Sequence, residues 1–166
     1  VEFPNEDGET KKTALNQVSI GIKRKEIIAL VGESGSGKSI LSRAVMNLIP
    51  APGKLISGSI LYSETDLLTL SHEKLASLRG RKIATIVSNP KGELDPLETV
   101  GQQISNVIIH HLGFTREQAK EKSIQLLQDV QIPDPKRRFD AYPHELSGGM
   151  AQRVIIAIAL ACDPEV

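Results

Sequence analysis

The eight residues GESGSGKS, Gly32–Ser39, contain the pattern G-x-x-x-x-G-K-S and decide the fold. An apolar run of strand length, EIIALV (Glu26–Val31), precedes them. Apolar residues at helical spacing follow from Ile40 to Leu48, until Pro50 ends the predicted helix. A buried strand, a glycine-rich turn and a helix in this order form a phosphate loop, whose successive backbone N–H groups point at the anion. The sequence therefore predicts an α/β fold with a phosphate bound at this turn.

The residue types in the loop suit a nucleoside triphosphate. Gly35 and Gly37 leave room for the backbone to wrap around phosphates. The Lys38 ammonium is expected between the β- and γ-phosphates, where it stabilises the transferred phosphoryl group, and the Ser39 hydroxyl is expected to ligate Mg²⁺. The predicted phosphate-binding residues are Gly32, Glu33, Ser34, Gly35, Ser36, Gly37, Lys38, Ser39 and Ile40.

The remaining pattern is that of a sheet-based core followed by helices. Strands are expected over residues 16–25, 26–31, 57–63 and 82–87, with a short helix around His72–Leu78. Helices are expected over Val100–Leu112 and from Thr115, a cap residue with Gln118 in capping-box register, to about Val130. The predicted divisions are a core over residues 1–96, a helical subdomain over 97–150 and a return helix over 151–166.

Composition excludes several classes of protein. The 166 residues carry 20 basic and 20 acidic side chains, so no electrostatic attraction to nucleic acid is expected. The longest apolar run, Val154–Cys162, is far shorter than the roughly 20 residues that span a bilayer. Cys162 is the single cysteine, and a buried, inert role is expected for it. The histidines 110, 111 and 144 lack companions at zinc-like spacing, and the basic cluster 136–138 is interpreted as a solvated loop.

A second candidate phosphate site lies near the end of the chain, in HELSGGMAQRVIIAIAL (His144–Leu160). Ser147, Gly148 and Gly149 lead into a long apolar helix, whose free N–H groups and dipole favour an anion. A short chain with two phosphate-binding segments needs an explanation.

The family resemblance explains the two segments. LSGGM (Leu146–Met150), Gln152, Arg153 and the helical insertion resemble the ATP-binding subunits of ABC transporters, over Phe3–Val166. The resemblance implies a P-loop NTPase core of ABC type, with a mostly parallel sheet, antiparallel N-terminal strands and a helical subdomain. It also implies ATP and Mg²⁺ as cofactors. Two such subunits close head to tail, so that the signature residues of one complete the γ-phosphate site of the other; here these are Ser147, Gly148 and Gly149.

Within the family, residues 141–164 and the polar link PNEDGETKKT (4–13) look most like importers of oligopeptides, dipeptides and nickel. The resemblance then implies that Phe3 stacks on adenine. It implies a motor subunit that couples ATP-driven dimer closure to solute transport, peripheral to the cytoplasmic face of the membrane. The implied partners are a second ATP-binding subunit, membrane-spanning permease subunits and, indirectly, an extracytoplasmic solute-binding protein, with no nucleic acid.

Two departures from the family pattern leave alternatives open. TIVSNPKGELDP (85–96) resembles the Q-loop, but Ser88 stands where the family has glutamine. One alternative is that metal coordination is weaker and hydrolysis slower. The other is that a bridging water compensates for the shorter side chain. No Asp-Glu strand follows ACDPE, so the chain is expected to end before the Walker B strand, and residues 1–166 alone are not expected to hydrolyse ATP. The alternatives are a non-catalytic nucleotide-binding fragment and an ABC-type ATPase of DNA repair.

Overall fold

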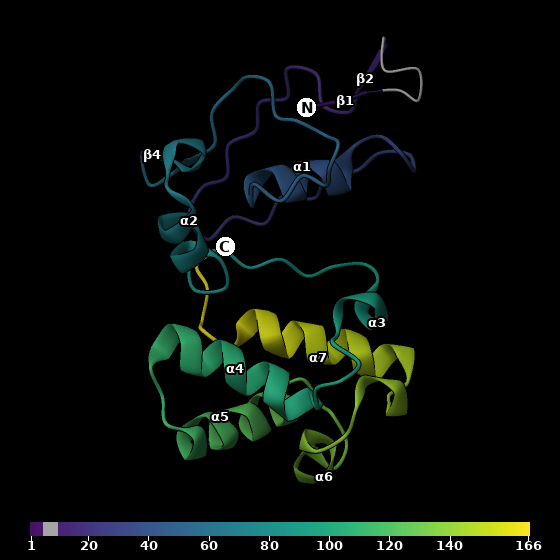
Figure 1. Cartoon of the computed structure of the whole chain (residues 1–166), viewed down its shortest axis with the longest axis vertical. Helices are drawn as coiled ribbons and strands as arrows, with labels where there is room; N and C mark the ends of the chain where they lie inside the picture. The colour runs from purple at the N-terminus through teal and green to yellow at the C-terminus, as the bar shows by residue number, and fades with distance from the viewer. Residues whose placement is uncertain (5–9) are drawn as a thin grey trace. The chain divides into compact units, whose positions relative to one another are not determined.

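The computed structural model describes residues 1–4 and 10–166, which form two compact units (Figure 1). The N-terminal unit is Val1–His72 and the C-terminal unit is Glu73–Val166. The first contains β1 (Glu2–Pro4), β2 (Lys11–Thr13), α1 (Lys38–Val45), β3 (Leu61–Tyr62), β4 (Thr65–Asp66) and the 3-10 helix η1 (Leu67–Thr69). From the boundary onward follow α2 (His72–Leu78), α3 (Pro90–Glu93), α4 (Val100–Leu112), α5 (Arg116–Asp129), α6 (Pro135–Phe139), the 3-10 helix η2 (Pro143–Glu145) and α7 (Gly148–Leu160).

Antiparallel pairing at the N-terminus is confirmed. β1 and β2 pair with Glu2 opposite Thr13 and Phe3 opposite Lys12. Glu2 also exchanges two backbone hydrogen bonds of 2.9 Å with Lys54, which ties the hairpin to the segment after α1. The predicted polar link 4–13 is shorter than expected, because its last residues form β2; residues 5–9 of the link lie outside the described part of the chain.

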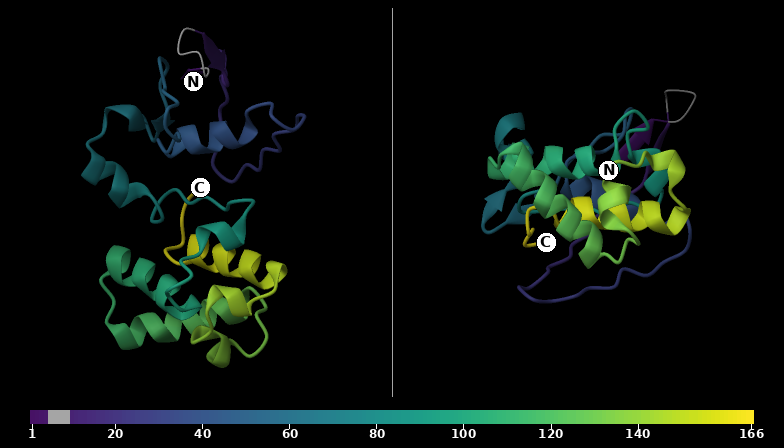
Figure 2. Two further views of the ribbon diagram at one scale, coloured as in Figure 1. Left: turned by 45° about the vertical axis from the view of Figure 1, so that its right-hand side comes forward. Right: turned by 90° about the horizontal axis from the view of Figure 1, so that it is seen from below.

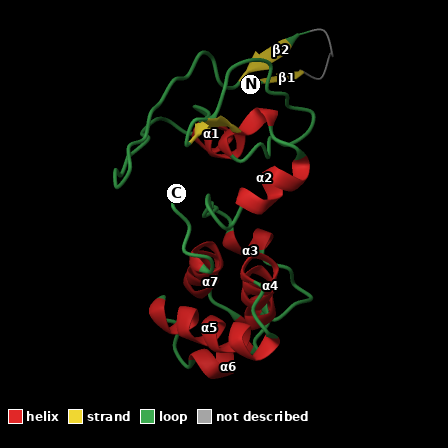
Figure 3. Cartoon of the chain, turned by 90° about the vertical axis from the view of Figure 1, so that its left-hand side faces the viewer, coloured by secondary structure: helices red, strands yellow, loops and turns green. Residues whose placement is uncertain are grey.

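The expected strands over residues 16–25, 26–31 and 82–87 are not formed, which corrects that part of the prediction. The described residues contain two two-stranded antiparallel sheets, β1–β2 and β3–β4, and the long connections of the N-terminal unit are loops (Figure 3). A buried parallel strand needs a hydrogen-bonded neighbour and cover on both faces. No described segment pairs with residues 26–31, and the side chains of Ile27 and Val31 are 97% and 90% exposed. Of residues 57–63, only Leu61–Tyr62 forms a strand.

The C-terminal unit is a packed helical bundle, in which α4, α5 and α7 lie side by side (Figure 2). On α4 the apolar side chains recur every four residues and are fully buried, as at Val100, Ile104 and Ile108. On α7 the buried face is built largely from alanines, with Val154 among them, and small side chains let neighbouring helices approach closely. Cys162 lies at the edge of this core and is buried, as expected.

The helix predictions for this unit are confirmed, because their signals are local. α4 begins and ends at the expected residues, and α5 begins after the capping box of Thr115 and Gln118. α2 also lies where it was expected. In the N-terminal unit, α1 ends at Val45, before Pro50, because Asn47 adopts a left-handed backbone with φ of +48°.

Two close contacts hold α4 against its neighbours. The Ser105 and Ser123 hydroxyl oxygens are 2.9 Å apart between α4 and α5, and Ser123 also donates to the Ala119 carbonyl at 2.6 Å. Gly101 allows the Phe139 ring of α6 to approach, since a Cβ at Gly101 would lie only 2.2 Å from its Cδ2. Among the residues that the structure describes, no helix is long and apolar enough to cross a membrane.

Candidate phosphate-binding site

The loop before α1 has a shape that only glycines adopt easily. Gly35 and Gly37 have φ of +83° and +95°, in the left-handed region that other residues rarely adopt. Gly37 is also the N-cap of α1, and a Cβ there would lie 2.6 Å from the carbonyl oxygen of Ala14. The turn therefore needs glycine at position 37 both for its backbone angle and for its contact with the segment after β2.

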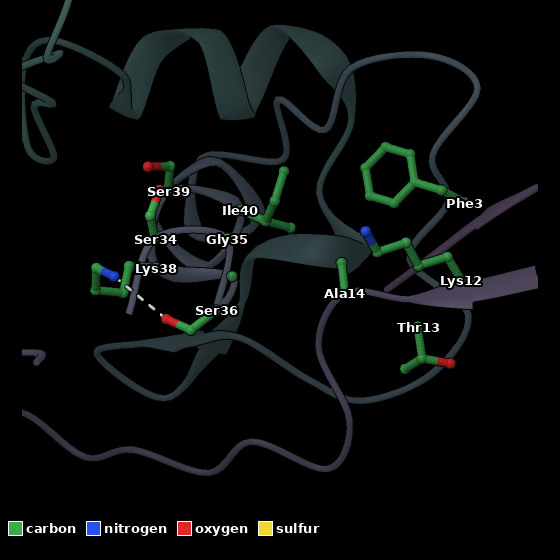
Figure 4. A pocket seen from close by; sticks show the side chains of 11 residues that line it. Phe3, Lys12, Thr13, Ala14, Ser34, Gly35, Ser36, Lys38, Ser39 and Ile40 are labelled. Atoms are coloured by element: carbon green, nitrogen blue, oxygen red, sulfur yellow. Dashed lines mark hydrogen bonds between the residues drawn. The ribbon is translucent and has the colours of Figure 1, made fainter. Parts of the chain in front are cut away.

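The Lys38 side chain turns back into its own loop. Its ammonium donates to the carbonyl oxygens of Gly32 and Glu33, both at 2.6 Å, and to the Ser36 hydroxyl at 3.2 Å (Figure 4). An ammonium has three protons, and three acceptors are present. The lysine thus fixes the curvature of the loop, while its charge stays at the edge of the hollow that the loop encloses.

The loop and the N-terminal hairpin enclose one hollow of about 640 Å³. Most of the predicted residues line it: Phe3, Ser34, Gly35, Ser36, Gly37, Lys38, Ser39 and Ile40. Gly32 and Glu33 are not among the lining residues, but their carbonyl oxygens accept hydrogen bonds from Lys38. The structure adds Lys12, Thr13 and Ala14 to the lining, residues that the sequence interpretation missed. Lys12 lies beside Phe3 through the register of β1 and β2, which the sequence alone does not give.

Phe3 is held in place by the segment that follows α1. A Cβ at Gly53 would lie 2.3 Å from Cε1 of Phe3, so Gly53 provides the space in which the ring rests. The ring is half-buried and borders the hollow opposite the phosphate loop in Figure 4. An aromatic side chain in this position offers a surface on which a planar ring can stack.

The second candidate segment is a well-formed helix N-terminus. Ser147 is the N-cap of α7, and its hydroxyl accepts a hydrogen bond from the Met150 N–H at 3.2 Å. Gly148 and Gly149 are exposed, with no atom within 4 Å of a Cβ built on either residue. These three residues belong to the C-terminal unit and do not line the hollow around Lys38.

The Q-loop position is at the surface. Ser88 is exposed and lies directly before Asn89, the N-cap residue of α3. The Asn89 amide lies against Gly92, where a Cβ would come within 2.7 Å of its Nδ2. Ser88 is therefore at the start of a short helix, and does not line the hollow around Lys38.

Two other titratable groups have pKa values shifted by burial. Within the described ranges, no three His, Cys, Asp or Glu residues gather as a metal site would require. Burial raises the pKa of the Cys162 thiol, which keeps it protonated and unreactive. Burial, followed by the charges of His110 and Arg81, lowers the pKa of His111.

The family described as ABC transporter matches residues 15–166, nearly the whole chain. The chain belongs to the ABC transporter family. The phosphate loop and the LSGGM segment both lie within the matched region, so the family resemblance of the sequence is confirmed.

Three relatives are named as peptide transport subunits. The oligopeptide transport ATP-binding protein AmiE of Streptococcus pneumoniae is 48% identical over 93% of this chain and 44% of its own length. The dipeptide transport ATP-binding protein DppD of Haemophilus influenzae is 44% identical over 96% of this chain and 48% of its own. OppD of Bacillus subtilis is 42% identical over 99% of this chain. The chain spans about half the length of these relatives.

The fold is also that of a solved cassette. A dimeric post-hydrolysis structure of the ATP-binding cassette MJ0796, bound to ADP and Pi, matches 99% of this chain and 68% of that chain. The TM-score is 0.85 at 28% sequence identity. The expected P-loop NTPase fold of ABC type is therefore confirmed, although the described residues form only the antiparallel strands and the helices of that architecture.

Proposed function

We propose that this protein is the ATP-binding and ATP-hydrolysing subunit of an ABC importer for peptides, of the dipeptide, oligopeptide or nickel type. One observation carries the proposal: the loop Gly32–Ser39 folds around a hollow that also contains Phe3 and the Lys38 ammonium. The peptide transport names of the relatives AmiE, DppD and OppD support the choice of solute.

The residues of the hollow have distinct roles in this proposal. The loop N–H groups and the Lys38 ammonium bind the β- and γ-phosphates, and Phe3 stacks on adenine. The Ser39 hydroxyl, exposed in the first turn of α1 and on the lining of the hollow, is a hard oxygen ligand of the kind Mg²⁺ accepts. When bound there, Mg²⁺ would supply positive charge that offsets the charge of the phosphoryl group, with Ser39 as the protein ligand that holds it.

The signature residues act on a second subunit in this proposal. Ser147, Gly148 and Gly149 complete the γ-phosphate site of a partner bound head to tail. Their exposure, the open space around the glycines and the N-terminus of a 13-residue helix behind them support this role. Closure of the dimer on ATP then drives transport through membrane-spanning permease subunits, which receive solute from an extracytoplasmic binding protein. In this proposal the subunit lies at the cytoplasmic face of the membrane.

Ser88 supports a second candidate, a nucleotide-binding subunit that hydrolyses slowly or not at all. A serine hydroxyl is too short to span the distance that a glutamine side chain covers, so contact with the metal and the attacking water would need a bridging water. Ser88→Gln separates the two candidates, since it should raise turnover only if the short side chain limits hydrolysis.

The test measures Mg-ATP affinity, and it measures phosphate release on the full-length protein, because residues 1–166 alone are not expected to hydrolyse ATP. We expect both in the wild type, weaker binding and loss of turnover in Lys38→Ala, and loss of turnover with retained binding in Ser147→Arg. Binding without phosphate release in the wild type would favour the second candidate. No nucleotide binding at all would contradict both. The solute is tested by comparing the uptake of a labelled dipeptide in cells that carry the gene and in cells that lack it.

A further inference from the structure

We infer that Lys12 contacts the base of the bound nucleotide and makes the hollow accept guanine nucleotides at least as well as adenine nucleotides. The inference rests on the proposed function, because it requires a nucleotide whose phosphates occupy the loop Gly32–Ser39. It extends the substrate from ATP alone to purine nucleoside triphosphates.

The hairpin places Lys12 beside the ring on which the base is proposed to stack. Lys12 is directly opposite Phe3 in the antiparallel register of β1 and β2, so the two side chains share one face. Both residues line the hollow. Figure 4 shows the Lys12 side chain extending from β2 past the Phe3 ring, on the side where Ala14 and Ile40 lie.

The Lys12 ammonium is available for a ligand. The side chain is exposed, and within residues 1–4 and 10–166 it makes no hydrogen bond or ion pair. Its neighbour Lys11 has a different environment, because its ammonium pairs with the Glu2 carboxylate at 3.2 Å. Lys12 is among the residues that line the hollow, and Lys11 is not.

The chemistry of an ammonium selects among bases. Stacking on Phe3 is tolerant, since every base has a π-face. An ammonium only donates hydrogen bonds, so it needs acceptors. Guanine presents two on one edge, O6 and N7, whereas adenine presents N7 beside the N6 amino donor, and cytosine presents its N4 amino donor there. Lys12 therefore finds two acceptors on guanine, one on adenine and none on the amino edge of cytosine.

The phosphate end of the hollow cannot make this distinction. Lys38 and the loop N–H groups contact the part of the ligand that all nucleoside triphosphates share. Phe3 has no hydroxyl and cannot hydrogen-bond to a base edge. Thr13 also lines the hollow, but its hydroxyl can both donate and accept and therefore favours no base. Lys12 is the cation beside Phe3, and the proposed selection by base depends on it.

The experiment titrates the purified protein with Mg-GTP, Mg-ATP and Mg-CTP by calorimetry, for the wild type, Lys12→Ala, Lys12→Arg and Lys11→Ala. We expect the wild type to bind GTP at least as tightly as ATP, and both more tightly than CTP. Lys12→Ala should weaken GTP binding by roughly fivefold or more, ATP binding by about twofold, and leave CTP binding unchanged, in line with the discrimination of a paired donor. Lys12→Arg should keep the preference for GTP.

Lys11→Ala is the matched control, since it removes the same charge from the opposite face of the strand and should change no affinity. Circular dichroism and the melting temperature of each variant verify folding. An equal loss for all three nucleotides in Lys12→Ala would assign Lys12 to the phosphates and overturn the inference, as would no change at all. A wild type that binds none of the three would instead contradict the proposed function, and the inference with it.

Discussion

The ammonium of Lys38 lies 2.6 Å from the carbonyl oxygen of Glu33. Glu33 belongs to the same loop that is proposed to bind phosphate together with this ammonium. The ammonium also donates to the carbonyl oxygen of Gly32 at 2.6 Å and to the Ser36 hydroxyl, so each of its three protons has an acceptor. A phosphate oxygen competes for the same three protons. Binding therefore exchanges carbonyl acceptors of the loop for charged acceptors of the ligand, and hydrogen bonds between charged groups are the stronger ones.

Lys38→Ala should weaken Mg-ATP binding by more than about tenfold, because a hydrogen bond to a charged group contributes about 1.5–3 kcal/mol. The melting temperature should change little, since the side chain is partly exposed and its three hydrogen bonds stay within one loop. Calorimetric titration measures the affinity. Lys11→Ala is the control, because it removes the same positive charge outside the loop. Unchanged affinity in Lys38→Ala would show that the loop binds without its lysine.

Gly37→Ala should damage the loop more than Gly35→Ala. Both positions have positive φ, which costs about 1–3 kcal/mol in other residues. At Gly37 the new Cβ would also lie 2.6 Å from the Ala14 carbonyl oxygen, whereas at Gly35 it would meet open space. We expect a lower melting temperature and weaker ATP binding in Gly37→Ala. Gly21→Ala is the control, since Gly21 has no atom within 4 Å of its Cβ position; equal effects at positions 35 and 37 would exclude the contact as a cause.

The helices were predictable because their signals lie within a few residues. The capping box of Thr115 and Gln118 and the four-residue spacing of Val100, Ile104 and Ile108 are readable without any knowledge of the fold. The phosphate loop was equally readable, since glycine, lysine and serine must occur at fixed spacing for a backbone to wrap around an anion.

The strands were not predictable in the same way, because a strand exists only with a partner. The run Glu26–Val31 has the composition of a buried strand, yet no described segment forms a ladder with it, and Ile27 is 97% exposed. Lys12 was missed for a related reason. Its place beside Phe3 follows from a hairpin register, and register is a long-range property of two segments.

Ser123→Ala should destabilise the C-terminal unit by about 1–3 kcal/mol, the cost of leaving a buried partner unsatisfied. The variant removes both the bond to Ser105 and the bond to the Ala119 carbonyl. Urea unfolding measures the free energy. The double variant with Ser105→Ala should cost less than the sum of the two single variants, since it removes both hydroxyls of the pair. Strict additivity would contradict direct coupling of the two serines.

His111 should make the protein less stable in acid. Burial, and then the charges of His110 and Arg81, lower the pKa of His111 below its ordinary 6.5, so the unfolded chain takes up the proton more readily than the folded one. The stabilisation is complete above the unfolded pKa and is lost as the pH falls from 6.5 toward the folded pKa. Comparison of wild type and His111→Gln by urea unfolding between about pH 7.5 and about pH 5 should therefore show a stability difference that shifts in favour of the variant on acidification.

Histidine NMR titration checks the cause directly. The His111 midpoint should lie below 6.5, and His110→Gln should raise it part of the way, because burial is the larger cause and remains. Gly80, whose Cβ position lies 3.3 Å from Nε2 of His111, is in the turn that covers the ring. Loosening that turn with a one-residue insertion after Arg81 should therefore raise the midpoint as well. A midpoint at or above 6.5 in the wild type would contradict both the burial and the predicted acid sensitivity.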